Sequence, residues 1–267
     1  MAKLGFIGSG NMAQALMKAI IDKGITNANY FLASDINDET LERVKKLNIK
    51  TTKDNNELVA ESDIIFLAVK PQVMEEVLKS IKHVVTEDKI ICSIAAGIKI
   101  KFIEEILGDR KVVRIMPNTP CLVAEMAAGY SHNDKVTAEE SEEVQRLLSA
   151  AGKAFKLDEE MLDAVTGLSG SGPAFVARLI QYFARAGKVN GLPEHISYEL
   201  ALKTFKGTAK LLEMYRLKPE DLVKLVSSPN GTTVAGREIL EHSDLKDVIE
   251  KTVTRATERS RELGEKK

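Results

Sequence analysis

A glycine-rich turn near the start of the chain is the feature that most limits how it can fold. The sequence Gly8-Ser9-Gly10-Asn11-Met12-Ala13 follows an apolar run at Lys3–Ile7 and leads directly into an amphipathic stretch, Met12–Lys23. This is the G-x-G-x-x-A pattern of the turn that joins a strand to a helix in dinucleotide-binding folds. Gly8 permits the tight turn, and Gly10 lets the backbone approach a pyrophosphate. Glycine-rich turns also serve purely structural roles, but the strand before and the helix after favour a dinucleotide site.

Up to about residue 158 the chain alternates short apolar runs with amphipathic stretches. That alternation is typical of a parallel sheet with helices on both faces. We expect strands at Lys3–Ile7, Tyr30–Asp35, Ile64–Val69, Ile90–Ala95 and Val112–Met116, with edge strands at Ala127–Ser131 and Ala154–Leu157. We expect helices at Met12–Lys23, Glu39–Leu47, Asn56–Glu61, Val73–Ile81, Lys101–Leu107 and Ala138–Ala151.

Past Glu159 the strand signals stop and one helical pattern follows another. Pro193 and Pro219 each suit the first turn of a helix, and a final helix is expected from Leu245 to about Leu263. We therefore predict an α/β protein of two domains. Residues 1–159 form a Rossmann-type doubly wound parallel sheet, and residues 160–267 form an all-α C-terminal domain.

The charge balance limits the class of partner. The 38 basic and 39 acidic side chains leave a net charge of -1, so no overall field draws the chain to nucleic acid or to an anionic membrane. The longest apolar runs are too short to cross a bilayer, and the start has no signal-peptide pattern. Cys92 and Cys121 have no metal-ligand spacing to each other or to the four histidines. We expect a cytoplasmic protein with reduced thiols, no metal site and a small diffusible substrate, without nucleic-acid or membrane partners.

Asp35 ends the second expected strand about 20 residues beyond the fingerprint, where a carboxylate accepts hydrogen bonds from an adenosine ribose and repels a 2′-phosphate. This position favours NADH over NADPH. In the other interpretation, Asp35 is a turn or helix-capping residue of Asp35-Ile36-Asn37-Asp38. Lys70 follows the third strand at the ligand-binding edge of the sheet, although it also suits an ordinary loop.

Several segments spread over both predicted domains share a further pattern. They are Gly5–Met12 (GFIGSGNM), Leu67–Gln72 (LAVKPQ), Ser93–Gly97 (SIAAG), Arg114–Pro120 (RIMPNTP), Gly167–Ala174 (GLSGSGPA) and Val226–Gly236 (VSSPNGTTVAG). In this order the segments resemble pyrroline-5-carboxylate reductases, and the last one resembles the C-terminal signature of that family.

The resemblance implies an activity, a cofactor and an assembly. Hydride passes from NADPH or NADH to the C=N bond of 1-pyrroline-5-carboxylate and gives L-proline, the last step of proline biosynthesis. The helical domain is then a dimerisation domain that interleaves with a second subunit, and the homodimer can assemble further, for example to a decamer. The resemblance implies a cofactor cleft lined by Phe6, Ile7, Gly8, Ser9, Gly10, Asn11, Ser34, Asn55, Ala68, Val69, Lys70, Pro71, Ser93, Ile94, Ala95 and Ala96, to which the fingerprint and its acidic residue add Met12 and Asp35. It implies substrate binding by Ser228, Gly231, Thr232 and Thr233, with Thr233 catalytic and nearest the imine nitrogen.

The residue types at Gly231-Thr232-Thr233 suit this role. A loop that opens a helix presents backbone N–H groups to a carboxylate, and the Thr233 hydroxyl can donate to or accept from a ring nitrogen. The same residues also suit a structural turn and helix cap. The chain has Asn230 where the family often has glycine, and asparagine tolerates the same left-handed turn. Asp35-Ile36-Asn37 also departs from the family, which puts a preference for NADPH in doubt.

Three further residues are candidate substrate contacts. Asn118 lies between Pro117 and Pro120 after a strand and is either a ligand contact or a loop asparagine. Ser171 and Gly172 either contact substrate or begin the long helix that follows, since small residues indicate a close approach. The histidines at positions 83, 132, 195 and 242 have no evident partner, and we expect surface positions for all four.

Two other functions remain open. A β-hydroxyacid dehydrogenase also opens with this fingerprint, but it places a catalytic lysine in a glycine-rich setting, and Gly167–Pro173 contains none. A non-catalytic NAD(P)H sensor keeps the fingerprint without needing the loop at Gly231–Thr233.

Overall fold

The computed structural model describes residues 2–265, whose contacts form two compact units. The first unit reaches to Ser171 and includes the end of the chain from Thr254, and the second spans Gly172–Val253. The sequence places the division earlier, between residues 159 and 160. It lies later in the structure because residues just past 159 pack on the sheet, where Leu162 is fully buried and Asp163 pairs with the buried Arg114.

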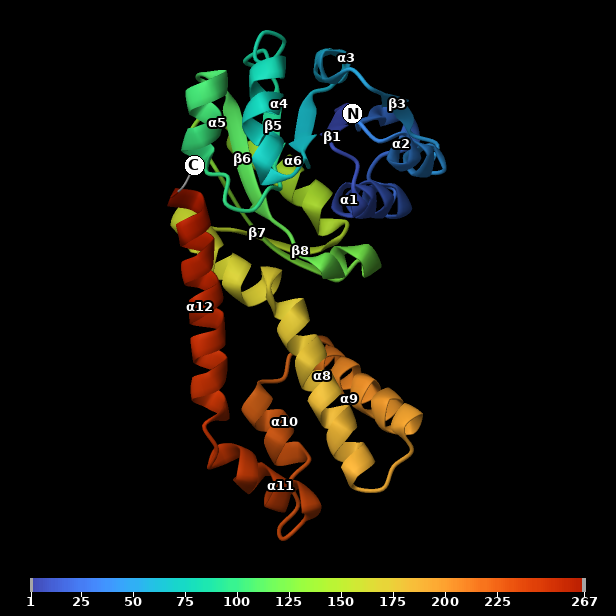
Figure 1. Ribbon diagram of the computed structural model, residues 1–267, viewed down its shortest axis with the longest axis vertical. Coiled ribbons are helices and arrows are strands. Elements are labelled where there is room, and N and C mark those ends of the chain that lie inside the picture. The colour runs from blue at the N-terminus through green and yellow to red at the C-terminus, as the bar shows by residue number, and fades with distance from the viewer. Residues whose placement is uncertain (1, 266–267) are drawn as a thin grey trace. The chain divides into compact units, whose positions relative to one another are not determined.

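The first unit is built on one eight-stranded sheet with the strand order β3-β2-β1-β4-β5-β6-β7-β8 (Figure 1). The strands are β1 (Leu4–Ile7), β2 (Phe31–Ser34), β3 (Lys50–Thr52), β4 (Ile64–Leu67), β5 (Ile90–Ser93), β6 (Lys111–Met116), β7 (Met126–His132) and β8 (Gly152–Lys156). Every neighbouring pair is parallel except β6 and β7. The doubly wound α/β prediction is therefore confirmed.

Two details of the sheet differ from the prediction. The connection from β6 to β7 is one 3₁₀ turn, Thr119–Val123, and so short a link joins antiparallel strands because a parallel pair needs a longer crossover. Strand β3 is not expected from the sequence at all. It has only three residues, Lys-Thr-Thr, and therefore lacks the apolar run by which the other strands are recognised.

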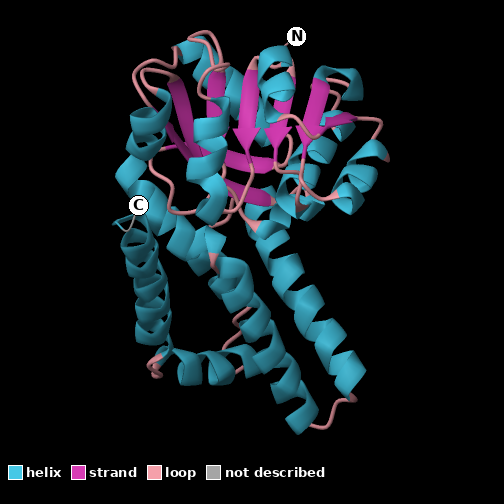
Figure 2. Ribbon diagram, turned by 45° about the horizontal axis from the view of Figure 1, so that its top comes forward, coloured by secondary structure: helices cyan, strands magenta, loops and turns pink. Residues whose placement is uncertain are grey.

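The helices of the first unit cover both faces of the sheet (Figure 2). They are α1 (Asn11–Asp22), α2 (Asp38–Lys45), α3 (Asn55–Glu61), α4 (Met74–Ile81), α5 (Ile100–Leu107), α6 (Ala138–Ser149) and α7 (Leu162–Val165). Short 3₁₀ turns lie at Ala28–Tyr30, Pro71–Val73, Thr119–Val123 and Glu159–Met161, and a π-helical turn at Thr166–Gly170. Side-chain caps begin several helices, as Asn37 does for α2 and Asp54 for α3.

The core of this unit lies in two layers, one on each face of the sheet. Alternate strand residues point to opposite faces, so Phe6 and Phe66 pack with α1 and α6 while Ile7 and Leu67 pack with α3, α4 and α5. The rings of Phe6 and Phe66 stack with 4.6 Å between their centroids. Because β1 lies at the centre of both layers, the turn that follows it starts from a rigid position.

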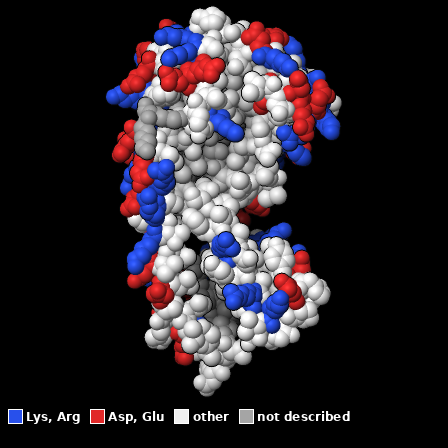
Figure 3. Space-filling model, in the orientation of Figure 1, with Lys and Arg blue, Asp and Glu red and all other residues white. Residues whose placement is uncertain are grey.

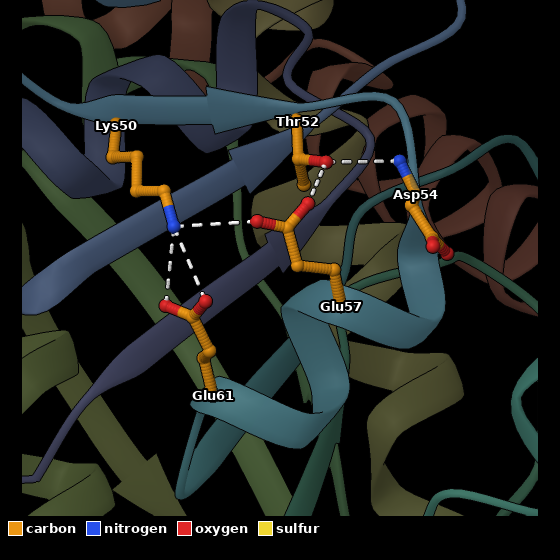
Figure 4. Close-up of polar contacts among 5 residues, drawn as sticks. All are labelled: Lys50, Thr52, Asp54, Glu57 and Glu61. Atoms are coloured by element: carbon orange, nitrogen blue, oxygen red, sulfur yellow. Dashed lines mark hydrogen bonds and ion pairs between the residues drawn. The ribbon is translucent and has the colours of Figure 1, made fainter.

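Strand β3 forms one edge of the sheet, and a polar cluster covers it (Figure 4). The amino group of Lys50 lies 3.2 Å from Glu61 and 3.3 Å from Glu57, and the Thr52 hydroxyl also bonds Glu57. The hydrogen bonds that Lys50 donates to Glu61 and then to Glu57 raise the pKa of Lys50. A charged edge of this kind discourages pairing with a strand of another chain.

Acidic and basic side chains are mixed over the part of the first unit visible in Figure 3, without a large region of one sign. Among residues 2–265, no helix combines the length and the apolar character needed to span a membrane.

The second unit is entirely helical, and the last helix continues from it into the first unit. The helices are α8 (Gly172–Val189), α9 (Glu194–Tyr215), α10 (Pro219–Leu225), α11 (Thr232–Glu241) and α12 (Leu245–Glu265). Helices α8 and α9 pack together, with the rings of Phe183 and Phe205 meeting edge to face at 5.1 Å. Many large apolar side chains of these helices are exposed in the single chain, including Val176, Tyr182, Val189, Leu200, Met214, Leu225 and Ile239.

Candidate functional site

The glycine-rich turn joins β1 to α1 in the predicted way. Gly8 has a φ of +84°, and an added Cβ atom would lie 2.8 Å from the backbone of Ala68, so only glycine fits there. At Gly10 an added Cβ would meet nothing within 4 Å. The turn therefore needs its first glycine for its own geometry, whereas the second keeps a space open in front of the helix.

The start of α1 is suited to an anion. Its N-cap is Gly10, which has no side chain to accept hydrogen bonds from the first turn. The N–H groups of that turn have no partner within the helix and carry the positive end of the helix dipole. Neighbouring side chains hold the turn itself, since the Ser9 hydroxyl donates to Ser34 O at 3.0 Å and the Gln14 amide donates to Ser9 O at 2.6 Å. This geometry fits the pyrophosphate of a dinucleotide.

Asp35 contacts the same turn from the end of β2. Its Oδ2 accepts a hydrogen bond from the Ser9 N–H at 2.8 Å, and its Oδ1 accepts from the Asn37 N–H at 2.9 Å. The second bond is the interaction expected of a turn residue, which the sequence offered as the other interpretation of Asp35. Asp35 therefore has a structural role. Each carboxylate oxygen keeps another lone pair, which leaves the group able to accept from a ribose hydroxyl.

A pocket of about 280 Å³ lies beside the turn. Its lining includes predicted cofactor residues from three strand ends, together with residues of the turn after β3 and of α4: Ile7, Gly8, Ser34, Asp35, Ile36, Lys53, Asn55, Val69, Val73, Glu76, Val77 and Ser80. Ser34 donates to Asn55 Oδ1 at 2.6 Å, which leaves the Asn55 amide NH2 free to donate elsewhere. The structure thus brings Gly8, Ser34, Asp35, Asn55 and Val69 together around one cavity.

Lys53 also lines this pocket, although no pattern in the sequence predicts it as a site residue. It directly follows β3, and Ser34 pairs with Thr52 across β2 and β3, so Lys53 lies next to Asp35 at the sheet edge. Its amino group is 2.6 Å from Asp38. Recognising β3 in the sequence would have placed Lys53 at this edge of the sheet, but the strand is too short and too polar to be recognised.

The loops after β4 and β5 meet β1 at the same edge of the sheet. Backbone hydrogen bonds join Ala68 to Ile7 at 2.8 Å and Ile94 to Leu67 at 3.1 Å. Ser93 is fully buried, while Lys70 is exposed and precedes the 3₁₀ turn that begins at Pro71. The predicted cofactor residues of these loops therefore lie at the carboxyl ends of adjacent parallel strands, where nucleotides bind in open α/β folds.

Asn118 is buried, and both the oxygen and the nitrogen of its side-chain amide form hydrogen bonds within the protein. Oδ1 accepts from the Ala127 N–H at 2.9 Å, and Nδ2 donates to Ser169 O at 3.1 Å. These bonds tie the turn before β7 to the π-helical turn, a structural role of the kind the loop interpretation expects. The Ser171 N–H closes the π-helical turn by donating to Thr166 O at 2.8 Å, and Gly172 begins α8. Substrate contact by these three residues stays a prediction.

The predicted substrate loop begins α11 in the second unit. Asn230 has a φ of +57°, the left-handed conformation expected for it. Gly231 is the N-cap of α11 and offers no side-chain cap, so the N–H groups of Thr232 and Thr233 remain available to an anion. Both threonine side chains are exposed, and Ser228 precedes them with its carbonyl accepting from the Gly231 N–H at 3.0 Å.

Cysteines and histidines do not form a site among the described residues, which contain no group of three or more potential metal ligands. Both cysteines are free and buried, and burial raises the pKa of Cys121 to about 11 and that of Cys92 further. Three histidines are exposed as expected, but His132 is half-buried, and its Nδ1 lies 2.8 Å from Asn133 O. It is the last residue of β7 and pairs with Val113 of β6.

Known proteins resemble this chain over nearly its whole length. Residues 159–263 match a family described as pyrroline-5-carboxylate reductase dimerisation, and residues 3–97 match one described as NADP oxidoreductase, coenzyme F420-dependent. A pyrroline-5-carboxylate reductase of Methanosarcina acetivorans is 40% identical over 99% of this chain and 98% of its own length.

Two solved structures agree with that sequence similarity. A pyrroline-5-carboxylate reductase from Coxiella burnetii matches with a TM-score of 0.94 at 29% identity, covering 98% of both chains. A Plasmodium falciparum pyrroline carboxylate reductase with NADP bound matches with a TM-score of 0.85 at 32% identity, again over 98% of both chains.

Proposed function

Because this chain belongs to the pyrroline-5-carboxylate reductase family, we propose that it reduces 1-pyrroline-5-carboxylate to L-proline, the last step of proline biosynthesis. The chain is an NAD(P)-dependent oxidoreductase. The observation that carries the proposal is similarity to named reductases along both predicted domains, including the part after residue 159. That extent favours the reductase over a β-hydroxyacid dehydrogenase, and the proposed reaction gives the loop at Gly231–Thr233 a use that a sensor lacks.

Bound NAD(P)H supplies the hydride in this reaction. The imine carbon gains the hydride, the ring nitrogen gains a proton, and proline and NAD(P)⁺ result. The chain's task is to hold both molecules in position. The open space at Gly10 and the uncapped start of α1 suit the cofactor pyrophosphate, while Asp35 suits the ribose.

Substrate binding by the 228–233 loop is part of the proposal. The free N–H groups of Thr232 and Thr233 are suited to the substrate carboxylate, because the start of α11 favours negative charge. The Thr233 hydroxyl can hydrogen-bond the ring nitrogen and orient the C=N bond. The left-handed Asn230 supports this role, since it shapes the turn that leads into the start of α11.

We also propose a preference for NADH. Asp35 lines the pocket with its carboxylate fixed by Ser9 and Asn37, where a second negative group would be repelled.

The chain is an oligomer that acts on a small molecule, as its dimerisation-domain match indicates. We propose that it is a homodimer and that dimers assemble further, with a decamer as one such assembly. The exposed apolar side chains on α8 to α12 support the dimer, because surfaces of this kind are usually covered by a partner.

Purified protein mixed with 1-pyrroline-5-carboxylate and either NADH or NADPH tests the activity. We expect cofactor oxidation with one proline formed per cofactor consumed, and faster turnover with NADH. Faster turnover with NADPH would contradict only the cofactor preference. Tight nucleotide binding without proline formation would contradict the reductase and support a sensor.

A further inference from the structure

A lysine side chain lines the pocket beside Asp35, and its position suggests that it influences cofactor choice together with Asp35. Among the described residues that line the pocket, Lys53 is the one cation, and it shares the lining with the carboxylates of Asp35 and Glu76. A site built only to reject a 2′-phosphate needs no lysine, since the carboxylates suffice.

Lys53 lies where it can reach the 2′ position of an adenosine ribose. The residue after β2 marks that position in dinucleotide-binding folds, and here it is Asp35. The register of β2 and β3 places Lys53 at the neighbouring strand end, since Ser34 pairs with Thr52. Asn55, two residues further on, lines the same pocket and has an NH2 group to donate.

The present partner of Lys53 is a weak one. Its amino group lies 2.6 Å from Asp38 Oδ1, but the two side chains are 61% and 77% exposed. Exposed pairs of this kind contribute little in water, and a lysine has several rotatable bonds. Lys53 can therefore leave Asp38 for a group of higher charge, such as a phosphate.

We propose that Lys53 is a specificity-determining residue that lets this site accept the 2′-phosphate of NADPH, with Asp38 as the competing partner that limits its contribution. The inference rests on the proposed function and refines its cofactor preference. Asp35 favours NADH, and Lys53 offsets part of the repulsion so that the site also accepts NADPH. Without Lys53, the charged side chains that remain among the described lining residues are the carboxylates of Asp35 and Glu76, and the preference for NADH becomes stronger.

Calorimetric titration with NAD⁺ and NADP⁺ tests the proposal without relying on turnover. We expect Lys53→Gln to weaken NADP⁺ binding about tenfold and to leave NAD⁺ binding within about twofold. Asp38→Asn is expected to strengthen NADP⁺ binding by up to about fivefold, because it releases Lys53. Added salt should reduce NADP⁺ affinity in the wild type more than in Lys53→Gln.

Lys50→Gln is the matched control. It removes the same charge three residues earlier in the chain, but the Lys50 amino group lies between Glu57 and Glu61 and is not part of the pocket lining (Figure 4). We expect it to change neither affinity. A Lys53→Gln protein that loses both nucleotides equally, or neither, overturns the proposal.

Nucleotide binding and proline formation distinguish the reductase activity from the role of Lys53. Wild-type protein that binds neither nucleotide overturns both the reductase and the role of Lys53. Wild-type protein that forms proline while Lys53→Gln keeps its NADP⁺ affinity overturns the role of Lys53 alone.

Discussion

The Ser260 hydroxyl donates a buried hydrogen bond of 2.6 Å to Oδ1 of Asp163, although 97 positions separate the two residues. The same carboxylate lies 3.6 Å from the buried guanidinium of Arg114, whose other partner is Glu159 at 3.1 Å. This cluster attaches the end of α12 to the unit that contains the sheet. The last turns of α12 therefore belong to the first unit, although they follow the second unit in the sequence.

Ser260→Ala should lower the free energy of unfolding by about 1–3 kcal/mol, because it leaves a buried carboxylate without one of its donors. Urea unfolding measures the change. Arg261→Ala, at an exposed neighbouring position on α12, is the control and should have little effect. Equal stability of the two variants would show that the hydrogen bond does not hold the helix in place.

Alanine at Gly8 and at Gly10 should have opposite consequences. Gly8→Ala forces a Cβ against Ala68 at a φ of +84°, so we expect a loss of about 1–3 kcal/mol in stability. Gly10→Ala has room for its methyl group and should keep its stability within about 0.5 kcal/mol, yet bind NADH at least about tenfold more weakly. Unfolding curves and nucleotide titration separate the two. Undiminished NADH binding by Gly10→Ala would mean that no pyrophosphate approaches this residue.

Removing the Thr233 hydroxyl should slow the reaction without disturbing the cofactor. Thr233→Val keeps the shape of the side chain and is expected to lower kcat/KM for the imine about 10²-fold, while Thr233→Ser keeps most of the activity. NADH affinity, measured by titration, should stay the same in both variants. If Thr233→Val is as active as the wild type, the hydroxyl does not act on the ring nitrogen.

Replacing Asp35 should change cofactor choice. Asp35→Ser removes the charge that opposes a 2′-phosphate but keeps an oxygen that can accept from the Ser9 N–H. We expect the ratio of kcat/KM for NADPH to that for NADH to rise about tenfold or more. Asp22→Asn, a paired aspartate on α1 outside the pocket, serves as the control. An unchanged ratio would assign Asp35 only the turn role that its bond to Asn37 already shows.

The thiols should be inert in the folded protein. Burial raises the pKa of Cys121 to about 11 and raises that of Cys92, so neither forms a thiolate near neutral pH. Because burial disfavours the thiolate, the contribution of a buried thiol to stability is greatest below the ordinary thiol pKa. That contribution is lost as pH rises from about 9 to about 11. A thiol reagent at pH 8 should label neither cysteine before denaturation and both afterwards. Rapid labelling of the native protein would contradict the burial.

Much of the fold can be predicted from the sequence because it depends on local patterns. The apolar runs mark the central strands, and the residues from Gly8 to Ala13 identify the glycine-rich turn between β1 and α1 before any packing is known. Backbone conformation limits Gly8, and the absence of a side chain at Gly10 keeps the adjacent space open. Asn230 is likewise predictable, since its left-handed conformation is one that asparagine tolerates.

Other features depend on residues that meet only in the folded chain. Strand β3 has no apolar run and exists because β2 offers it a hydrogen-bonding edge, so Lys53 could not be placed in the pocket from the sequence. The polar ends of Asn118 find partners at Ala127 and Ser169, which the sequence does not indicate. The sequence by itself determined the family, the central strands of the sheet and the glycine-rich turn, because their signals lie within short segments. Only the tertiary structure decided which charges share the pocket and where the first unit ends, because those contacts join segments far apart in the chain.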